Sequence, residues 1–599
     1  MQKYILAVAL FFNLSAMAPA IADPISLFVN QCLSYQADIG SFRYAQDLTD
    51  KTQSLEQTLL GLHNINDRLH YYRELTQSAH HGQSLLLCQV HLADELEQLL
   101  SEPHLIQWTH YLALLPAPYP QLGSLLQGLS AQILPIATKS QLHTAQASIN
   151  FSLKQRQFTL KFNDPHCQPF APALPNSGNN STATDNAAHN DTASGYKPVS
   201  ISRYLFTQPD EACRRSAWQD YQRRLNQRSA AALQLIKQIR SDFAKSQGVN
   251  NYGLWQLQQQ QLSQDEIWAY LASQTQLTQV KPWNLAQALA KETHRFDALE
   301  GEHTLMQLFE ALAPLGIRIE TLQDYEAKLP PHSENSPSSK VNLKAPVLDE
   351  QHTVVYRIWH NDRLLGEIFS NVGDKNSAYI LRQSLPGRQF GQVALSVQSN
   401  ILRRSDAIAL ITGISDAIAS LGNGAAFYLV ATLGREAQTS IGSLWLSQYL
   451  TEAINLAPLS PREQLLDEHK RQFKVFNSKL VLAFYLSPQE GFSASTQKKL
   501  AEEFALSFGE PWQDASQLIY AFGAIANEGV SYYLPLWHQS LAQLIFQQSR
   551  SLTPEDIFNI LIVNETYAPL KDQLAQLISG PVDPLSLIRR FTHASITQE

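Results

Sequence analysis

The chain has 599 residues, of which 44% are hydrophobic and 16% are charged, and its formal net charge is -8. This composition excludes a fibrous or largely disordered protein, and the length allows two or three domains. The mildly acidic balance argues against a dedicated nucleic-acid-binding protein.

The first 22 residues (1–22) predict a secretory signal peptide. Lys3 gives a positive start, residues 4–12 (YILAVALFF) form an apolar core, and residues 20–22 (AIA) form a small-x-small cleavage site. The alternative is an uncleaved anchor, but the core is short for a membrane span and ends at Asn13. No later segment stays apolar for about 20 residues. We therefore expect an exported protein of the periplasm or extracellular space, with no membrane span after cleavage.

Residues 23–150 predict an N-terminal helical region, because apolar side chains recur there every three or four residues. The whole chain has four cysteines, and an even number in an exported protein permits two disulfides in any of three pairings. Four buried free thiols are the alternative. Proximity in sequence favours the pairs Cys32–Cys88 and Cys167–Cys213.

Residues 151–210 predict an irregular segment. Within it, residues 172–198 are poor in apolar side chains and rich in Asn, Ser, Thr, Ala and Pro, which predicts a flexible insertion. The helical pattern returns in residues 211–247, which carry a basic face. Acidic neighbours and the lack of interleaved aromatic side chains favour a solvated helix face over a nucleic-acid contact. The basic face consists of Arg214, Arg215, Arg223, Arg224 and Arg228.

A small sheet is predicted at about residues 353–397. Two apolar runs, VVYRIW and LLGEIF, flank a turn, so Thr353–Phe369 predicts a β-hairpin. Shorter strands are expected at residues 378–385 and 392–397. The next segment, residues 409–421 (ALITGISDAIASL), has apolar side chains at helical spacing. The predicted fold class is mainly α, with a small β-hairpin or sheet before this helix.

Six segments of the chain carry a resemblance to a known family. They are a helix pair from Cys213 that ends at GVNNY (248–252), LFEALAPLGIRIE (308–320), YRIWHNDRLLGEIF (356–369), QVALSVQSN (392–400), FGAIANEGVSYYLPLWHQSLAQLIF (522–546) and DPLSLIRRF (583–591). In this order they resemble the M3 family of metallopeptidases, the thimet oligopeptidase and oligopeptidase A group. The resemblance covers about residues 200–595. It implies a large helical protein with two lobes around a deep channel, and it makes residues 211–599 the peptidase-like region.

The resemblance places the family's zinc site on the helix at residues 409–421, but the site residues are replaced. The family holds zinc with two histidines at i and i+4 and a third ligand, and a glutamate beside the first histidine activates water. Thr412 and Asp416 stand at the two histidines, and Gly413 stands at the glutamate. Leu444 stands near the third ligand, a glutamate in the family. We therefore expect no catalytic and no metal-binding residues here.

The resemblance also covers a helix that faces the zinc in the family. Tyr532 matches one transition-state tyrosine, whereas Glu528 and Pro535 stand where the family has tyrosine. Tyr532, Glu528 and Asp416 are thus candidate cleft-lining residues. Asp416 is a carboxylate in an otherwise apolar helix, so it should meet a water-filled cleft or a cation. The candidate cations are Arg403, Arg404 and Arg435.

The combined expectation is an exported pseudoenzyme without a cofactor, which binds peptides or a protein partner and does not hydrolyse them. The small side chains of residues 412–419 fit either an open cleft or a helix that is simply packed. An active zinc metallopeptidase with an atypical site is the first alternative, and it alone would require zinc. A structural partner of an active relative is the second.

Overall fold

A computed structural model describes most of the chain. The signal peptide predicted at residues 1–22 and the insertion predicted at residues 172–198 lie outside the described residues. The described residues are 23–44, 47–75, 78–154, 165–167, 200–292, 296–322, 353–434, 436–487 and 491–596.

The chain forms two compact units, and each is built from three separated parts of the sequence. Unit 1 comprises Met1–Ile133, Asp297–Leu456 and Ile545–Ser579. Unit 2 comprises Leu134–Phe296, Ala457–Leu544 and Gly580–Glu599. The domain boundaries expected from the sequence follow chain order, and they stay a prediction.

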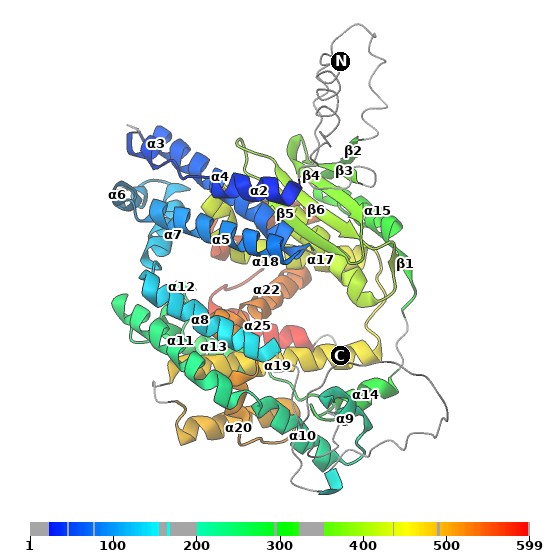
Figure 1. Ribbon diagram of the computed structural model, residues 1–599. Coiled ribbons are helices and arrows are strands. Elements are labelled where there is room, and N and C mark those ends of the chain that lie inside the picture. The colour runs from blue at the N-terminus through cyan, green and yellow to red at the C-terminus, as the bar shows by residue number, and fades with distance from the viewer. Residues whose placement is uncertain are drawn as a thin grey trace, which may run out of the picture. The chain divides into compact units, whose positions relative to one another are not determined.

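Unit 1 begins with a group of helices, α2 to α7 (Figure 1). Polar side chains cap the starts of three of them. Asp23, Asp47 and Ser78 accept hydrogen bonds from the first free backbone N–H groups of α2, α4 and α5. Leu55 and Leu59 of α4 lie in the core beneath these helices and are fully buried. The helices of unit 1 are α2 (Pro24–Leu33), α3 (Ile39–Tyr44), α4 (Leu48–Glu74), α5 (Ala79–Leu100), α6 (Pro103–Leu112), α7 (Tyr119–Ala131), α15 (Gly301–Ala311), α17 (Arg404–Gly422), α18 (Glu436–Ala453), α23 (Pro554–Phe558) and α24 (Leu570–Leu577).

A five-stranded sheet in the order β2-β3-β4-β6-β5 lies in unit 1. β3 and β4 form the hairpin that the sequence predicted, and β6 pairs parallel to β4 and antiparallel to β5. β2 was not predicted, and neither was the short antiparallel pair of β1 and β7. The strands are β1 (Leu299–Glu300), β2 (Ile317–Thr321), β3 (Val354–His360), β4 (Arg363–Val372), β5 (Ser377–Arg382), β6 (Gly391–Val397) and β7 (Asn400–Ile401).

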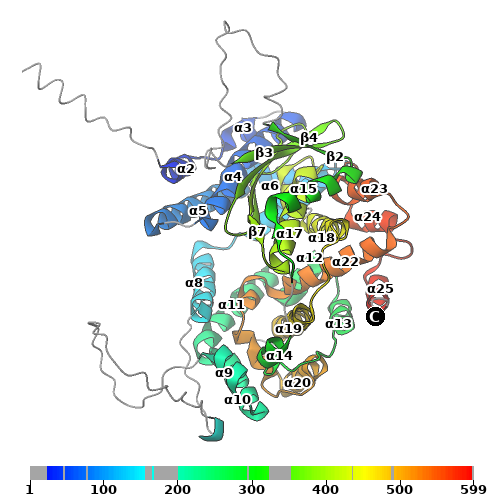
Figure 2. The same cartoon turned by 90° about the vertical axis from the view of Figure 1, so that its right-hand side faces the viewer.

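Helices cover both faces of β5. Ala378 faces α17, because a Cβ atom at Gly413 of that helix would lie 3.3 Å from the Cβ of Ala378. Tyr379 faces the other way, and its ring lies 5.9 Å from the ring of Tyr71 on α4. Successive strand residues point to opposite faces, so the sheet lies between α4 and α17, as Figure 2 shows.

The approach of α17 to the sheet depends on two glycines. Gly366 of β4 and Gly391 of β6 are neighbours in the parallel pair. A Cβ atom would lie 2.8 Å from Leu421 of α17 at Gly366 and 2.4 Å from it at Gly391. Only glycine leaves room for the end of the helix at this distance.

Unit 2 is almost entirely helical in its described part. The helix α22 (Leu534–Gln548) is divided between the units: its residues up to Leu544 belong to unit 2, and those from Ile545 belong to unit 1. The other helices of unit 2 are α8 (Ile136–Lys154), α9 (Ile201–Thr207), α10 (Glu211–Arg223), α11 (Asn226–Ser246), α12 (Tyr252–Gln259), α13 (Gln264–Ser273), α14 (Leu285–Lys291), α19 (Pro461–Leu486), α20 (Ala494–Phe508), α21 (Ala524–Asn527) and α25 (Pro584–Ile596).

Aromatic side chains form much of the core of unit 2. Trp218 of α10 lies at the centre of one cluster, with ring centroids 5.3 Å from Trp512, 5.9 Å from Trp283 and 6.1 Å from Phe504. These four residues come from distant parts of the sequence. Their mutual burial therefore ties the separated parts of unit 2 together.

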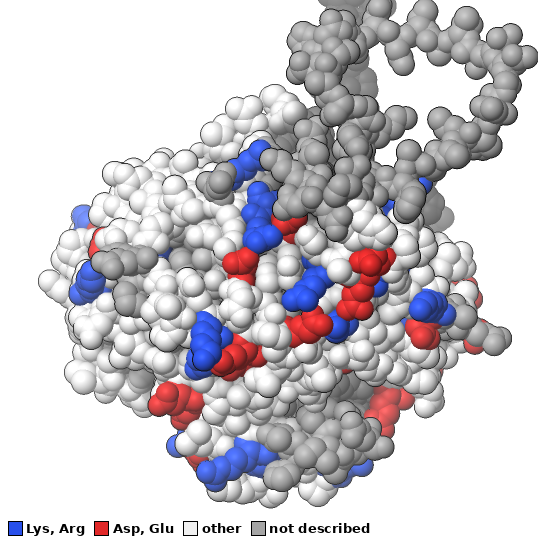
Figure 3. Space-filling view, turned by 90° about the horizontal axis from the view of Figure 1, so that it is seen from below, with Lys and Arg blue, Asp and Glu red and all other residues white. Residues whose placement is uncertain are grey.

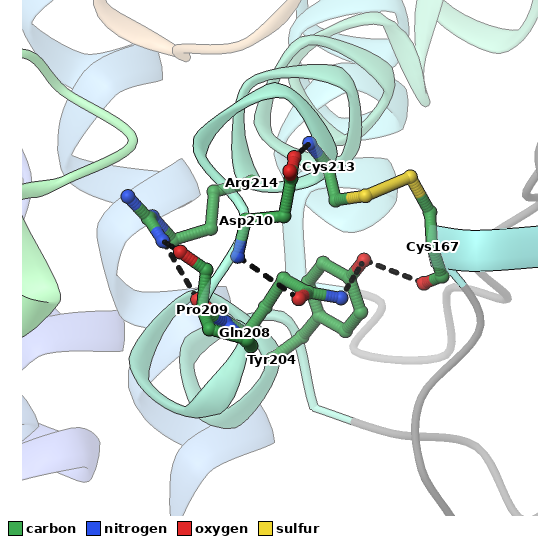
Figure 4. The surroundings of a disulfide bond; sticks show 7 residues. All are labelled: Cys167, Tyr204, Gln208, Pro209, Asp210, Cys213 and Arg214. Atoms are coloured by element: carbon green, nitrogen blue, oxygen red, sulfur yellow. Dashed lines mark hydrogen bonds between the residues drawn. A yellow bond between two sulfur atoms is a disulfide. The ribbon is translucent and has the colours of Figure 1, made fainter.

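Each unit contains one disulfide, and the pairs are those predicted from sequence proximity. Cys32 and Cys88 join α2 to α5 in unit 1, and Cys167 and Cys213 join a short 3-10 turn (Pro165–Cys167) to α10 in unit 2. Figure 4 shows the second pair, where Tyr204 donates a hydrogen bond of 2.6 Å to the carbonyl of Cys167. No free cysteine is found in the described part of the chain.

The expectation of a mainly α fold with a small sheet before the residue 409–421 helix is confirmed. The channel between two lobes remains a prediction. One described helix, α17, is long and apolar enough to cross a membrane by length and composition, although 61% of its apolar window is buried inside the structure. The core helix of a protein without membrane spans passes the same test.

Candidate functional site

The helix at the predicted zinc position, α17, presents a hydroxyl and a bare backbone where the family has a histidine and a glutamate. Thr412 is half-buried and Gly413 is buried. The contact distance of 3.3 Å to the Cβ of Ala378 is already short for a Cβ atom at position 413. A larger side chain there would press on β5. Position 413 therefore holds no proton acceptor that could activate water.

Asp416 is the one acidic side chain in the middle of α17, and its partner is a hydroxyl group. Ser443 of α18 donates a hydrogen bond to the carboxylate. Solvent reaches this side chain, yet burial among protein atoms raises its pKa, and the bond from Ser443 opposes that rise. The expectation of a cation is wrong for Arg403, which pairs with Asp406 at 2.9 Å. Arg435 lies outside the described residues.

An aliphatic side chain stands near the position of the family's third zinc ligand. Leu444 is half-buried on α18, directly after Ser443, and offers no donor atom. Among the described residues, no group of three or more His, Cys, Asp or Glu is arranged to hold a metal ion. Zinc prefers imidazole, thiolate and carboxylate ligands in a tetrahedral set. The residues at positions 412, 413, 416 and 444 therefore do not fit the zinc ion that the resemblance implies.

The other predicted site residues lie in unit 2, on a 3-10 helix, η5 (Gly529–Tyr533), and just before it. The ring of Tyr532 is 5.4 Å from the ring of Phe522, and the ammonium of Lys474 lies 3.4 Å from the centroid of Tyr532. Burial raises the pKa of Tyr532, so its phenol stays protonated near neutral pH. Burial lowers the pKa of Lys474, and the charge of Glu528, which is exposed beside them, opposes that fall.

The segment that carries Tyr532 is held in place by polar side chains from α11 and α12. Arg240 of α11 donates hydrogen bonds to the carbonyls of Ala526 at 2.7 Å and Asn527 at 3.0 Å. Gln256 of α12 accepts a bond of 2.7 Å from the N–H of Val530 and donates one to the carbonyl of Glu528. Buried and charged bonds of this kind restrict the backbone. The backbone just before Tyr532 is therefore held in a fixed conformation.

Two of the five arginines in the basic face predicted after residue 211 form ion pairs with carboxylates. Arg223 pairs with Asp220 and with Asp514 at 2.7 Å, and Arg215 pairs with Glu510 at 3.1 Å. Figure 3 shows acidic and basic side chains intermingled on the face of the molecule that it presents. A nucleic-acid surface would instead gather one sign of charge. The absence of a nucleic-acid partner stays a prediction, and the mixed charges on this face support it.

Comparison with known proteins identifies the fold. PZ peptidase A with an inhibitor aligns over 96% of this chain and 97% of that chain, with a TM-score of 0.53 and 10% identity. A protein assigned as an oligoendopeptidase F aligns over 98% of both chains with a TM-score of 0.54 and 10% identity. A protein of Chlamydophila abortus assigned as a peptidase aligns over 96% of both chains, with a TM-score of 0.52 and 13% identity. The chain shares the overall fold of these peptidase structures.

At this level of identity the likeness concerns the M3-like fold and carries no activity. No protein family and no curated protein matches the sequence significantly. The geometry adds one residue in each unit that the sequence did not indicate. Ser443 and Lys474 are ordinary helix residues in the sequence, and only the helix packing shows that one bonds Asp416 and the other covers Tyr532. The small pair Gly442-Ser443 on α18 was the one available signal.

Proposed function

We propose that the protein is an exported pseudoenzyme with an M3-like peptidase fold, which binds peptides or a protein partner without hydrolysing them. The observation that carries this proposal is the side-chain set on α17. Thr412, Gly413 and Asp416 stand where zinc hydrolysis needs two imidazoles and a base. The carboxylate of Asp416 is already bonded to Ser443. Without an ion to activate water, the retained fold can bind a chain but has no route to cleave it by this chemistry.

The cluster of Tyr532, Phe522 and Lys474 supports a peptide as the ligand. A fixed aromatic pair offers apolar contact area, and a protonated phenol donates a hydrogen bond to a backbone carbonyl. The ammonium of Lys474 lies over the ring of Tyr532 and adds a positive charge for an acidic side chain or a carboxyl terminus. Aromatic side chains with a few placed polar groups are typical of ligand-binding sites.

The first experiment measures metal content and hydrolysis on the same purified mature protein. We expect less than one tenth of an equivalent of zinc by mass spectrometry and no cleavage of fluorogenic peptides of 5 to 15 residues, with or without added zinc. One equivalent of zinc together with chelator-sensitive cleavage would overturn the proposal in favour of an active metallopeptidase.

The second experiment measures binding of peptides of 5 to 15 residues by fluorescence anisotropy. We expect saturable binding that weakens about tenfold in Tyr532→Ala, since one buried aromatic anchor contributes about 1–2 kcal/mol. The matched control is Tyr221→Ala, because Tyr221 is also a half-buried tyrosine of unit 2 with a cation, Arg224, 3.8 Å from its ring centroid. Absence of peptide binding, with co-purification of an active relative, would favour a structural partner instead.

Export is tested by the mature amino terminus. The predicted cleavage after Ala22 and the two disulfides both favour an oxidising compartment. We expect protein recovered from the periplasm or medium to begin at Asp23. A cytoplasmic protein that keeps Met1 and reduced cysteines would contradict export and leave the binding proposal to stand on its own test.

A further inference from the structure

A cavity of about 820 Å³ lies in unit 1, away from the residues of the predicted zinc position. One wall is the tight turn between β3 and β4, from His360 to Arg363. The other wall runs from Asn559 to Gln576, along a π-helix, the loop after it and α24. The volume is that of a typical small-molecule site.

Two buried polar atoms at this cavity are left without partners. Gln573 is fully buried, and its Nε2 donates a hydrogen bond of 2.7 Å to the carbonyl of Ile560. Its Oε1 has no hydrogen-bond partner among the described residues. His360 is 7% exposed, and its Nε2 is likewise unpartnered in the part of the chain that the structure describes. An unsatisfied buried polar atom costs about 1–3 kcal/mol, so two at one cavity call for a ligand that satisfies them.

The backbone around the cavity is also unusual. The π-helix η6 (Asn559–Val563) forms part of the wall, and such helices are frequent at functional sites. It ends at Asn564, which has a left-handed conformation with φ of 43°, and Asn361 in the opposite turn has φ of 51°. Backbone conformations of this kind cluster where a protein holds a ligand. This observation is independent of the unpartnered atoms.

The charges at the cavity disfavour anionic ligands. The guanidinium of Arg363 is occupied by Glu565 at 3.0 Å and by the carbonyl of Gly422, the last residue of α17, at 3.2 Å. Burial and the nearby Arg363 lower the pKa of His360, so its ring is neutral. Asp362 and Glu565 leave a slight acidic excess, which disfavours anions. Besides the exposed carboxylate of Asp362, the groups that remain for recognition are neutral amides, a neutral imidazole and a few aliphatic side chains.

We propose that this cavity binds a neutral saccharide. A hydroxyl group both donates and accepts a hydrogen bond, so it satisfies the acceptor Gln573 Oε1 and either tautomer of the His360 imidazole. The aliphatic side chains of Ile560 and Val563 give an apolar surface for the C–H face of the sugar ring. Asn559 and Gln576 add amide groups of the kind that bind adjacent hydroxyls.

The test measures binding to the mature full chain by calorimetry, with a panel of neutral hexoses, pentoses, N-acetylhexosamines and their disaccharides. Spermidine, citrate and trialanine serve as cationic, anionic and peptide probes. The variant His360→Phe keeps the ring that packs 5.3 Å from Phe558 and removes Nε2. Gln576→Ala removes an exposed amide at the cavity, and Lys571→Ala is the matched control on the same helix, outside the cavity lining.

We expect at least one saccharide to bind saturably at millimolar concentration or below, with affinity reduced at least tenfold in His360→Phe and at least threefold in Gln576→Ala. Lys571→Ala should bind as the wild type does. The Nε2 resonance of His360 should shift on binding, in ¹⁵N-histidine spectra. Binding of spermidine, citrate or trialanine in place of sugars, or of no probe at all, would overturn the proposal. So would saccharide binding that both cavity variants leave unchanged.

Discussion

At the scale of single residues, a buried carboxyl group makes stability depend on pH. Glu56 of α4 is fully buried, and it accepts a hydrogen bond of 3.0 Å from the N–H of Tyr428. Burial raises its pKa to about 7, with the bond from Tyr428 and the charge of Arg388 opposing the rise. The folded state therefore binds a proton more tightly than the unfolded chain, whose glutamates titrate near pH 4.3. Stability should fall as pH rises from about 4.5 to about 7 and then level off.

The variant Glu56→Gln should be more stable than wild type at pH 8 by about 1–3 kcal/mol, because it removes the buried charge and keeps an acceptor for Tyr428. At pH 4.5 the two proteins should unfold alike. Burial also raises the pKa of Asp67 to about 7. Part of the dependence of stability on pH should therefore remain in Glu56→Gln. Urea titrations across this pH range measure the effect. The control is Glu74→Gln, an exposed glutamate on the same helix, and a similar gain there would contradict the argument.

Asp416 should show the same sign of pH dependence. Its folded pKa is raised, so its contribution to stability is lost as pH rises from the unfolded value of about 3.9 through the folded value. Asp416→Asn should raise the melting temperature at pH 8, and the gain should shrink toward pH 4. Ser443→Ala should raise the pKa of Asp416 further, as carboxyl ¹³C shifts would report. An unchanged pKa in Ser443→Ala would disprove the hydrogen bond in solution.

How far the sequence predicts these residues depends on where their partners lie. The two cysteine pairs followed from proximity along the chain, and the β3–β4 hairpin followed from two apolar runs around a turn. Ser443 as the partner of Asp416 could not follow, because it depends on how α18 packs against α17. The cavity could not be foreseen either, since His360 and Gln573 are far apart in the sequence and only the packing of the hairpin turn against the later helices brings them together.

At the scale of elements, the short strands were the hardest to predict. β2 has five residues, and only its pairing with β3 makes it a strand. The helix α17 was predicted because its apolar spacing is regular, but its burial on nearly all sides was not. A helix amphipathic in sequence is buried along most of its second half here, because glycines in β4 and β6 let it approach the sheet closely. Periodicity therefore predicts the element and not the distance to its neighbours.

The contact between α17 and the sheet can be tested with glycine substitutions. Gly366→Ala should destabilise the protein by about 1–3 kcal/mol, because its new Cβ would lie 2.2 Å from the carbonyl oxygen of Gly391 and would force the backbone to move. Gly128→Ala is the matched control inside α7, where nothing lies within 4 Å of the new atom. It should stabilise by about 0.5–1 kcal/mol through helix propensity. Denaturant unfolding measures the change in the free energy of unfolding for each variant. Equal changes in Gly366→Ala and Gly128→Ala would disprove the close packing at Gly366.

The same helix permits a gain-of-function test. Thr412→His with Asp416→His restores two imidazoles four residues apart on α17, which is the spacing that lets both reach one ion. We expect the double variant to bind zinc or nickel at micromolar concentration, since two ligands without a third make a weak site. The wild type and each single variant should bind at least tenfold less. Failure of the double variant, if it folds, would show that these two positions do not share an accessible face.

At the scale of the whole molecule, each compact unit is assembled from three parts of the chain and contains one disulfide. The bridge Cys32–Cys88 closes a sequence separation of 56 residues and Cys167–Cys213 one of 46. By the loop-entropy relation each bridge should contribute about 4 kcal/mol. Because a bridge restricts only the segment it closes, the effect of removing it should stay within its own unit.

Hydrogen exchange can locate that effect. In Cys32→Ser with Cys88→Ser, exchange should accelerate in α2, α4 and α5, while α9, α10 and α11 stay protected. Cys167→Ser with Cys213→Ser is the matched control and should give the reverse pattern. Apart from the cysteines themselves, both variants keep the buried apolar side chains of both units, so local opening is expected before global unfolding. Equal loss of protection in all six helices, in either variant, would show that the two units unfold as one cooperative structure and that the division of the chain into units has no energetic counterpart.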